Sequence, residues 1–125
     1  MTQRNELLDF SLTLTGAVAD RPFEDDLDTT VVRHGAEGKW FGLLMKVSGK
    51  HLGRAENERF DVVNLKIDPE ESYIVREIYP GSILPAYHMN KRHWISVILD
   101  GSVPNDFCEM LIGKSYDLTK PKRRK

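Results

Sequence analysis

The N-terminal part of the chain has an apolar pattern of helical period. Apolar residues recur there roughly every three or four positions, at Leu7, Leu8, Phe10, Leu14 and Val18. This spacing is typical of an amphipathic helix with one buried side. We therefore predict a helix from Arg4 to about Thr13.

The pattern then changes to the alternation of β-strands, with candidates at residues 29–34, 40–47 and 60–67. The second candidate has Phe41, Leu43, Met45 and Val47 on one side and Trp40, Gly42, Leu44 and Lys46 on the other. The third opposes Val63, Leu65 and Ile67 to Val62, Asn64 and Lys66. Because short turns join these strands, we expect antiparallel pairing.

A second helix is predicted over residues 68–81, where Asp68 can cap the N-terminus and Pro69 suits the first helical position. Glu71 would complete a capping box. The predicted buried stripe of this helix consists of Tyr73, Ile74, Ile78 and the neighbouring Tyr79. Residues 82–92 are predicted as a turn-rich linker, 93–99 as a strand and 104–118 as a final helix.

These elements follow the order α-βββ-α-β(β)-α, which predicts an α+β fold: a two-layer sandwich of an antiparallel sheet with helices packed on one face. We expect Val63, Leu65 and Ile67 to face the helices, together with Ile95, Val97 and Leu99. The other face would be partly open. It would carry Trp94, Ser96, Lys66, Asn64, Lys46 and, if its strand keeps the same register, Trp40.

Composition adds limits to this picture. The 125 residues suit one domain, predicted over residues 1–119, followed by a basic tail over 120–125. No apolar run approaches the roughly 20 residues that a membrane span requires. The only cysteine is Cys108, so no intrachain disulfide can form, and we expect a cytoplasmic protein. The net charge of −1 gives the whole molecule no general attraction to nucleic acid.

The densest polar stretch is HMNKRHW, residues 88–94. His88 and His93 are five positions apart, unlike the pair of a helical zinc site, and we expect neither a metal nor another cofactor. No nucleophile motif surrounds Ser82 or Ser96, and Cys108 is expected to be a buried structural thiol. The sequence therefore predicts a protein that is not an enzyme.

Nucleic-acid binding requires cations for phosphates and aromatic faces for unstacked bases. Trp94 beside Lys91 and Arg92 could form such a surface on the open sheet face. The alternative, which the residues alone favour, is that Trp94 anchors the linker at the sheet edge. His88, Asn90 and His93 would then hydrogen-bond to the backbone of the turn.

Four segments together resemble the MmcQ/YjbR family of small bacterial proteins: NLKIDPEE (64–71), LPAYHMNKRHWISVIL (84–99), DGSVP (100–104) and LIGKSYDL (111–118). LDFSLTLTGAVADRPF (8–23) and FGLLMKVSGKHLG (41–53) resemble its N-terminal half more loosely. Positions matching the family pattern are Asn64, Lys66, Pro69, His88, Asn90, Lys91, His93 and Trp94. Ala86 stands where the family often has glycine, and the basic tail is an addition.

The resemblance implies an antiparallel two-layer fold similar to the CyaY (frataxin-like) and secretion-chaperone-like architecture, and a DNA-binding role. Our first hypothesis is therefore a protein that binds DNA with low sequence specificity. The residues expected to contact DNA are Lys46, Lys50, Lys66, His88, Asn90, Lys91, Arg92 and Trp94, with the tail adding phosphate contacts. The alternative is a protein-interaction module or homodimer that uses a sheet face with Trp40, Leu44, Trp94 and Ile98.

Overall fold

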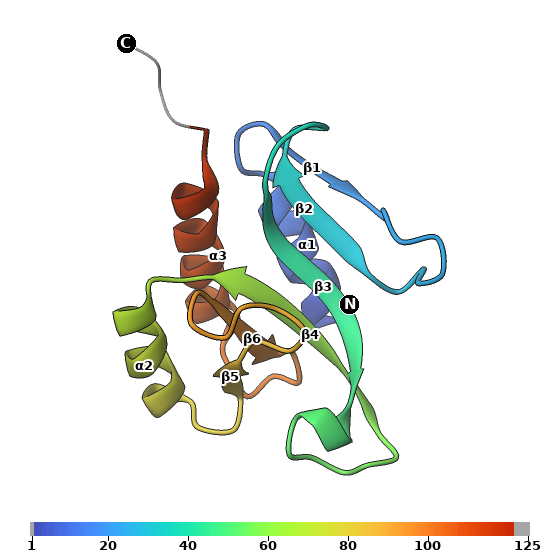
Figure 1. The fold of residues 1–125 in the computed structure, drawn as a ribbon, viewed down its shortest axis with the longest axis vertical. Coiled ribbons are helices and arrows are strands. Elements are labelled where there is room, and N and C mark those ends of the chain that lie inside the picture. Colours follow the sequence, from blue (N-terminus) through green and yellow to red (C-terminus); the bar gives the residue numbers. More distant parts are fainter. Residues whose placement is uncertain (1, 122–125) are drawn as a thin grey trace.

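The structure is a computed structural model that describes residues 2–121 (Figure 1). The α-helices are α1 (Gln3–Leu12), α2 (Pro69–Ile78) and α3 (Asn105–Thr119), and η1 (Gly49–His51) is a short 3-10 helix. The strands are β1 (Ala17–Asp20), β2 (Thr30–His34), β3 (Trp40–Ser48), β4 (Arg59–Lys66), β5 (Ile83–Pro85) and β6 (Trp94–Ile98). They form one sheet in the order β1-β2-β3-β4-β6-β5, with antiparallel neighbours throughout. The predicted α+β class is confirmed.

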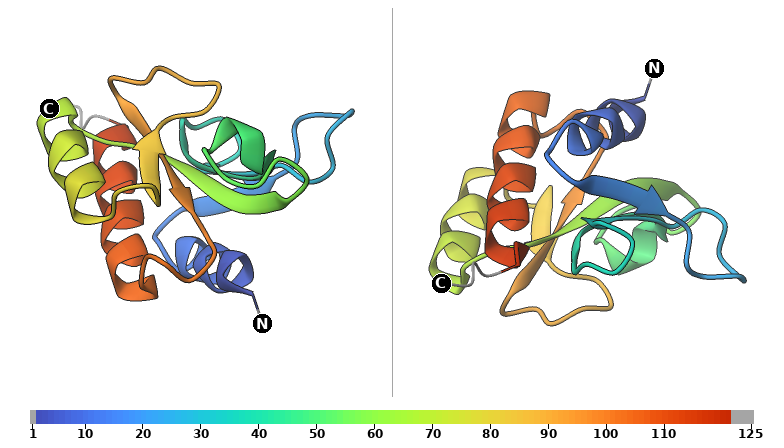
Figure 2. Two further views of the ribbon diagram at one scale, coloured as in Figure 1. Left: turned by 90° about the horizontal axis from the view of Figure 1, so that it is seen from below. Right: turned by 90° about the horizontal axis from the view of Figure 1, so that it is seen from above.

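One face of the sheet packs against α1 and α3 (Figure 2). Its core contains the six residues predicted to face the helices, Val63, Leu65, Ile67, Ile95, Val97 and Leu99. Leu7 of α1 and Leu111 and Ile112 of α3 fill the space above them. This apolar layer is the main source of stability, because burial of apolar surface is the dominant favourable contribution to folding.

The opposite face was predicted to be partly open, and in the structure a loop covers part of it. A second apolar cluster lies on it, formed by Val31, Leu43, Met45, Val47, Leu52, Val62 and Ile98. The segment of residues 86–93, called here the 86–93 loop, lies on the side of the sheet away from α1 and α3 (Figure 2). Its Tyr87 and Met89 pack against this cluster, so a loop covers part of the face that the sequence pattern left uncovered.

The two sides of β3 also differ from the prediction. The register between β2 and β3 shifts at Val32/Arg33, which places an irregularity next to Phe41. As a result, Phe41 packs in the helix-side core together with Leu44, whereas Trp40 packs with Leu43 in the second cluster. Simple alternation fails here because a β-bulge adds one residue and reverses the direction of every side chain before it.

The N-terminus of α2 forms largely as predicted. The Asp68 carboxylate accepts a hydrogen bond from the Glu70 backbone N–H at 3.0 Å, and Pro69 occupies the first turn. The predicted contribution of Glu71 to a capping box is wrong. Its carboxylate lies 3.0 Å from the ammonium of Lys114 on α3, so an ion pair between helices takes the place of the box.

The prediction of which residues of α2 are buried is wrong. Tyr73, Ile74 and Ile78 are 69%, 58% and 53% exposed, and Ser72 and Val75 are buried instead. The helix contacts the short edge strand β5 rather than the centre of the sheet. A narrow edge strand covers only a narrow stripe of a helix, so most of the apolar side of α2 stays in contact with solvent.

Two strands were not predicted. β1 contains Val18, which the helical spacing assigned to the first helix and which is 37% exposed at the sheet edge. β5 lies within the predicted linker and ends at Pro85. Both are edge strands of three or four residues, too short for alternation to identify. Proline has no backbone N–H to donate. It is tolerated in an edge strand because one side of that strand has no neighbouring strand to accept such a hydrogen bond.

Candidate nucleic-acid interface

The 86–93 loop connects β5 to β6 and contains most of the HMNKRHW stretch. Tyr87 and Met89 anchor it from below by packing on the second apolar cluster. Ala86 is fully buried where the loop leaves β5. The exposed side of the loop carries His88, Lys91 and Arg92. The loop is therefore a fixed cover that presents polar side chains outward.

A buried hydrogen-bond network ties this loop to the sheet. The Ser96 hydroxyl donates to Asn64 Oδ1 at 2.5 Å, and Asn64 Nδ2 donates to the Tyr87 carbonyl at 2.9 Å. The Tyr87 backbone N–H in turn donates to Ser96 Oγ at 2.9 Å. Asn64 and Ser96 are fully buried. These side chains form hydrogen bonds with backbone groups of the loop that no strand pairs with. Asn64 therefore has a structural role and does not lie at the surface.

Asn90 and Lys91 brace the loop from within. Asn90 Oδ1 accepts hydrogen bonds from the backbone N–H groups of Arg92 at 2.9 Å and His93 at 3.2 Å. The Lys91 ammonium donates to the carbonyl of Ala86 at 2.6 Å. The prediction that Asn90 braces the turn agrees with this geometry. Lys91, in contrast, has one of its donors engaged by the loop, which leaves Arg92 as the loop's cation without an internal partner among residues 2–121.

Aromatic contacts connect the 3-10 turn after β3 to the loop. The centre of the His51 ring lies 5.0 Å from that of the Tyr87 ring, and the centre of the His88 ring lies 3.9 Å from it. His88 has a φ of 63°, a left-handed conformation that is strained for a residue with a side chain. These contacts place Lys50, the residue before His51, at the border of the loop.

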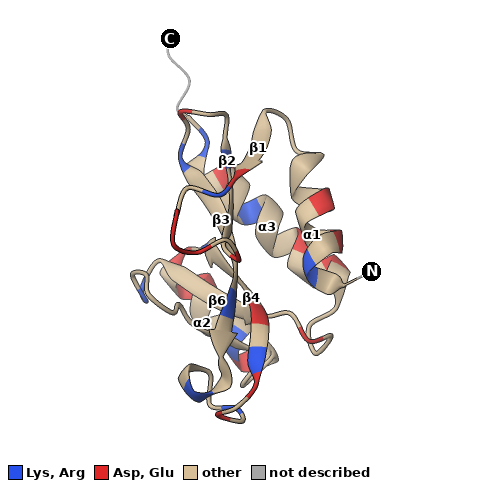
Figure 3. Cartoon of the chain, turned by 90° about the vertical axis from the view of Figure 1, so that its right-hand side faces the viewer, with Lys and Arg blue, Asp and Glu red and all other residues tan. Residues whose placement is uncertain are grey.

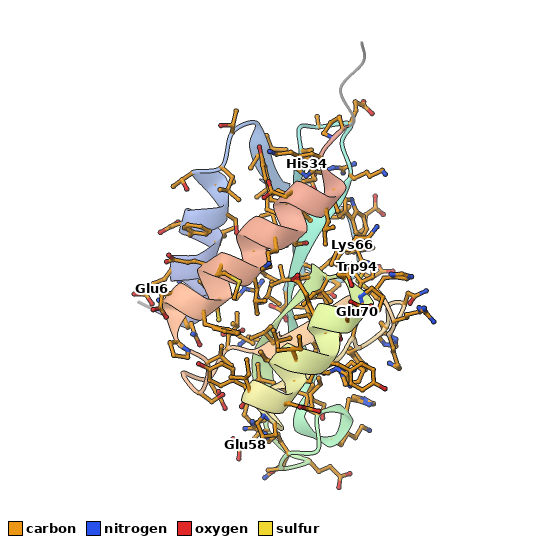
Figure 4. The ribbon with its side chains drawn as sticks, turned by 90° about the vertical axis from the view of Figure 1, so that its left-hand side faces the viewer. Glu6, His34, Glu58, Lys66, Glu70 and Trp94 are labelled. Atoms are coloured by element: carbon orange, nitrogen blue, oxygen red, sulfur yellow. The ribbon has the colours of Figure 1, made fainter. Side chains whose placement is uncertain are left out.

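Lys66 and Trp94 are paired across β4 and β6, next to the start of α2 (Figure 4). The Lys66 side chain is half-buried and makes no ion pair within the described part of the chain. Trp94 is half-buried against the second cluster, as is Trp40. The predicted role of Trp94 as an open stacking surface is therefore not supported by its packing, whereas the alternative, an anchor at the sheet, is.

Lys46 lies on the other side of the sheet from Lys66. Its ammonium is 3.1 Å from Asp61 Oδ1, which also lies 3.5 Å from the guanidinium of Arg4 on α1. The prediction that placed Lys46 on the face of Lys66 and Trp94 is wrong because of the register between β3 and β4. Lys46 pairs with Asp61, which lies on the helix side beside Arg4 of α1.

The cations near the 86–93 loop are in no ion pair, a property that they share with some other cations. Within residues 2–121, the ion-paired cations are Arg4, Arg33, Lys46, Arg54, Arg59, Lys114 and Lys120. Those in no ion pair are Lys50, Lys66, Lys91 and Arg92 at the loop and its border, together with Arg21, Lys39 and Arg76. Figure 3 shows Lys and Arg interspersed with Asp and Glu along the chain rather than gathered into one basic strip. Four of the seven unpaired cations of the described residues therefore belong to the loop and its border.

The structure also bears on three other possibilities: a reactive Cys108, a metal site at His88 and His93, and a membrane span. Burial, with smaller contributions from Asp106 and Glu109, raises the pKa of the Cys108 thiol to about 12, which keeps it protonated at neutral pH. No group of three or more His, Cys, Asp or Glu residues suited to a metal occurs in the described part of the chain, so His88 and His93 are not joined by further ligands. No described helix is long and apolar enough to cross a membrane.

Sequence reasoning missed a surface hollow of about 430 Å³ beside His34. Thr15, Gly16, Gly35, Tyr116 and Lys120 contribute to its wall. His34 Nε2 is 2.8 Å from the hydroxyl of Thr119, and its ring lies 4.5 Å from that of Tyr116. Burial lowers the pKa of His34. The wall comes from three separate segments, so no local sequence pattern could have revealed it.

The late Ser-Tyr pair, Ser115 and Tyr116, has a structural explanation. The Ser115 hydroxyl accepts from the Lys66 backbone N–H at 2.9 Å and donates to the Phe41 carbonyl at 2.6 Å. It thereby satisfies two backbone groups beside the bulge in β3 that the strand ladder leaves unpaired. The Tyr116 hydroxyl donates to the Thr15 carbonyl and ties α3 to the segment before β1.

Comparisons with known proteins agree with this arrangement. The chain is 39% identical over 105 residues to the uncharacterized protein YyaQ of Bacillus subtilis, covering 84% of this chain and 87% of that one. It is 28% identical over 112 residues to the uncharacterized protein YjbR of Escherichia coli, covering 90% and 82%.

Solved structures give the same result. A crystal structure of a Pseudomonas syringae protein superposes with a TM-score of 0.85 at 36% identity, covering 94% of this chain and 98% of that one. A crystal structure of a Deinococcus radiodurans protein gives a TM-score of 0.75 at 30% identity, covering 94% and 78%. The family model described as YjbR matches residues 12–118, the full span from the end of α1 to the end of α3. The chain belongs to the YjbR family.

Proposed function

We propose that the protein is a non-enzymatic, cytoplasmic nucleic-acid-binding protein that contacts phosphates through the 86–93 loop and its border, with low sequence specificity. The observation that carries the proposal is the pairing of the cations. Lys50, Lys66 and Arg92 have no acidic partner in the described residues, whereas most other cations do. An unpaired cation on a rigid cover is available to a phosphate, since no internal ion pair has to be broken first.

The arrangement of the loop supports the same function. Asn64, Ser96 and Asn90 hold its backbone by hydrogen bonds, so Arg92 is presented from a fixed position. A preorganised site loses less conformational entropy when it binds. The modest number of cations and the net charge of −1 predict weak binding, with a small salt slope of about 0.9 for each phosphate contacted on duplex. The basic tail beyond Pro121 lies outside the described residues, and its contribution has to be measured separately.

The test is fluorescence anisotropy of labelled duplex and single-stranded oligonucleotides across a range of salt concentrations. The double variant Arg92→Gln/Lys66→Gln is compared with Lys39→Gln/Lys114→Gln, which removes the same charge elsewhere. Each lost phosphate contact is expected to reduce the slope of log affinity against log salt by about 0.9 for duplex and about 0.7 for a single strand. The control should keep the slope of the original protein.

A chain lacking residues 120–125 separates the tail from the folded domain. If it binds as steeply with salt as the full chain, the domain makes the contacts. Loss of all binding in the shortened chain, with no effect of the Arg92/Lys66 change in the full chain, would contradict the proposal. So would the absence of binding to any oligonucleotide at low salt.

A second candidate is self-association through α2, favoured by the exposure of Ile74 and Ile78. The sheet face with Trp40, Leu44, Trp94 and Ile98 does not serve this purpose, because Leu44 packs on the helix side and Ile98 is buried. A stripe on one helix can pack on its own copy about a twofold axis. Sedimentation that shows a dimer insensitive to salt, broken by Ile74→Lys, would support this candidate.

A further inference from the structure

A groove of about 490 Å³ lies between the first turns of α2 and the 86–93 loop. Pro69, Glu70, Tyr73 and Arg92 line it. Tyr73 is highly exposed, with 69% of its surface in contact with solvent. The groove borders the loop that carries the proposed phosphate contacts, so a strand bound there would pass this ring.

The tyrosine ring is held by a neighbouring cation. The guanidinium carbon of Arg76 lies 5.0 Å from the centre of the Tyr73 ring, and Arg76 Nε donates to the Ser72 carbonyl and hydroxyl, each at 3.2 Å. The hydrogen bonds to Ser72 hold the guanidinium in place along α2. The guanidinium in turn covers one face of the Tyr73 ring. An exposed aromatic ring whose position is held in advance is suited to stack with a planar group.

The charges in the groove define that planar group further. Arg92 provides a guanidinium for an anion, and Arg76 adds a second positive charge beside the ring. Glu70 lines the same groove, and its carboxylate is in no ion pair within residues 2–121. A carboxylate accepts hydrogen bonds but donates none, so it requires a hydrogen-bond donor on the ligand, and on the edge of a nucleobase the donors are N–H groups. The ligand should therefore combine a flat ring, N–H donors at its edge and an anionic group.

We propose that this groove receives an unpaired nucleotide, with its base stacked on Tyr73, its phosphate at Arg92 and the base edge donating to Glu70. The inference rests on the proposed function and names its substrate class as single-stranded nucleic acid. Guanine fits best, because its N1–H and N2–H₂ donors are adjacent and match the two oxygens of a carboxylate. In a duplex those donors are engaged by cytosine and the ring face is covered by stacking, so only an unpaired base can enter.

The experiment uses the full chain and fluorescein-labelled 12-mers of thymidine that contain one central guanosine, one central inosine or neither, with a duplex of mixed sequence beside them. Inosine lacks the N2 amino group. Tyr73→Leu is expected to weaken single-strand binding about 5- to 150-fold, the range found when a base-stacking aromatic residue is removed. Tyr73→Phe keeps the ring and should bind as the original protein does. Duplex affinity should be unchanged in both.

Glu70→Gln tests the edge contact. The original protein should prefer the guanosine strand over the inosine strand by about 5-fold or more, the size of one good contact to a base edge, and the variant should lose this preference. Ile74→Ala, a change on the same helix outside the groove, is the matched control. It should alter neither affinity nor preference.

The outcomes separate this inference from the proposed function. If Tyr73→Leu binds single strands as well as the original protein, while Arg92→Gln/Lys66→Gln weakens them, the groove inference is overturned and the phosphate proposal stands. If no strand binds at low salt, both are overturned. If Tyr73→Leu instead abolishes a dimer seen by sedimentation and no nucleic acid binds, the ring belongs to a protein interface, and the groove inference is again overturned.

Discussion

The face of the sheet that packs on α1 and α3 and the face under the 86–93 loop differ in what holds their covers in place. On the helix side, apolar residues such as Leu111 and Ile112 pack against the central strands. On the loop side, the buried side chains of Asn64 and Ser96 bind the loop backbone. Helices satisfy their own backbone hydrogen bonds, whereas a loop cannot, so a buried loop needs polar side chains from the sheet.

This difference has a functional consequence. The helices α1 and α3 are held on the sheet by apolar contacts, so the side that faces the sheet must be apolar and can contain few polar residues. The 86–93 loop, held by hydrogen bonds and by the inward packing of Tyr87 and Met89, leaves its outward side chains free to vary, and binding residues are often found on such loops. Arg92 and the groove at Tyr73 both lie at the loop side. The comparison can be tested by weakening each cover in turn.

The largest effect is expected on the helix side, from Leu111→Ala. Leu111 is 2% exposed, so its removal leaves a cavity in the main core. We expect the free energy of unfolding to fall by about 2–5 kcal/mol, measured by urea denaturation. Leu118→Ala on the same helix is the control, because Leu118 is half exposed. Equal effects of the two changes would contradict the role assigned to the helix-side core.

Asn64→Ala tests the polar tether of the loop. It removes the acceptor of the Ser96 hydroxyl and the donor to the Tyr87 carbonyl, both in a buried position. We expect a loss of about 1–3 kcal/mol, the usual cost of unsatisfied buried polar groups. Amide hydrogen exchange at Tyr87 should become faster, whereas exchange in α3 should follow only global stability. The exposed Asn57→Ala is the control, and unchanged exchange at Tyr87 would show that the tether is unimportant.

Lys91→Met separates bracing from binding within the loop. The Lys91 ammonium donates to the Ala86 carbonyl at 2.6 Å, so its loss should lower the free energy of unfolding by about 0.5–1.5 kcal/mol. Because that ammonium is engaged, the change should reduce nucleic-acid affinity less than Arg92→Gln does. The two variants are compared by denaturation and by anisotropy. The reverse order of affinities would assign the phosphate contact to Lys91.

The smallest effect is expected from the titration of His34, on the helix side. Burial lowers the pKa of His34 below its ordinary value of 6.5, and Lys120 adds to this, against a hydrogen bond with the Tyr116 backbone that raises it. The unfolded chain therefore binds the proton more readily, and stability is lost as the pH falls below about 6.5 toward the folded pKa. The melting temperature of the original protein should fall more than that of His34→Gln between pH 7.5 and pH 5.5. Parallel pH profiles would contradict the assignment.

The local sequence predicted structure correctly where the structure depends on a single short-range pattern, such as a helix cap or the alternation of a strand. The cap at Asp68 and the alternation of Val63, Leu65 and Ile67 were predicted correctly, because both depend on neighbours within a few residues. The family pattern also marked Asn64 and Asn90, and the structure shows that both hold the loop. The pattern pointed to the right residues without showing whether they face a ligand or the protein interior.

The errors have a common physical origin in long-range packing. The bulge at β3 reversed the sides of Trp40 and Phe41 relative to the rest of the strand, because one inserted residue changes the phase of alternation. The apolar side of α2 was assigned to the core, although a helix at the sheet edge buries only the stripe that meets β5. The spacing of apolar residues along the chain predicts neither the bulge nor the position of a helix relative to the sheet.

The α+β class, the main core strands and the family follow from the sequence alone, because they depend on periodicity and on motifs within short segments. The partial cover on the second sheet face, the ion pair between Lys46 and Asp61, and the exposure of Tyr73 beside Arg92 required the folded structure. Pairing, burial and exposure depend on which distant residues meet in space. Contacts with distant segments brace the HMNKRHW stretch as a loop, and its exposed cations are Lys91, which also donates to Ala86, and Arg92.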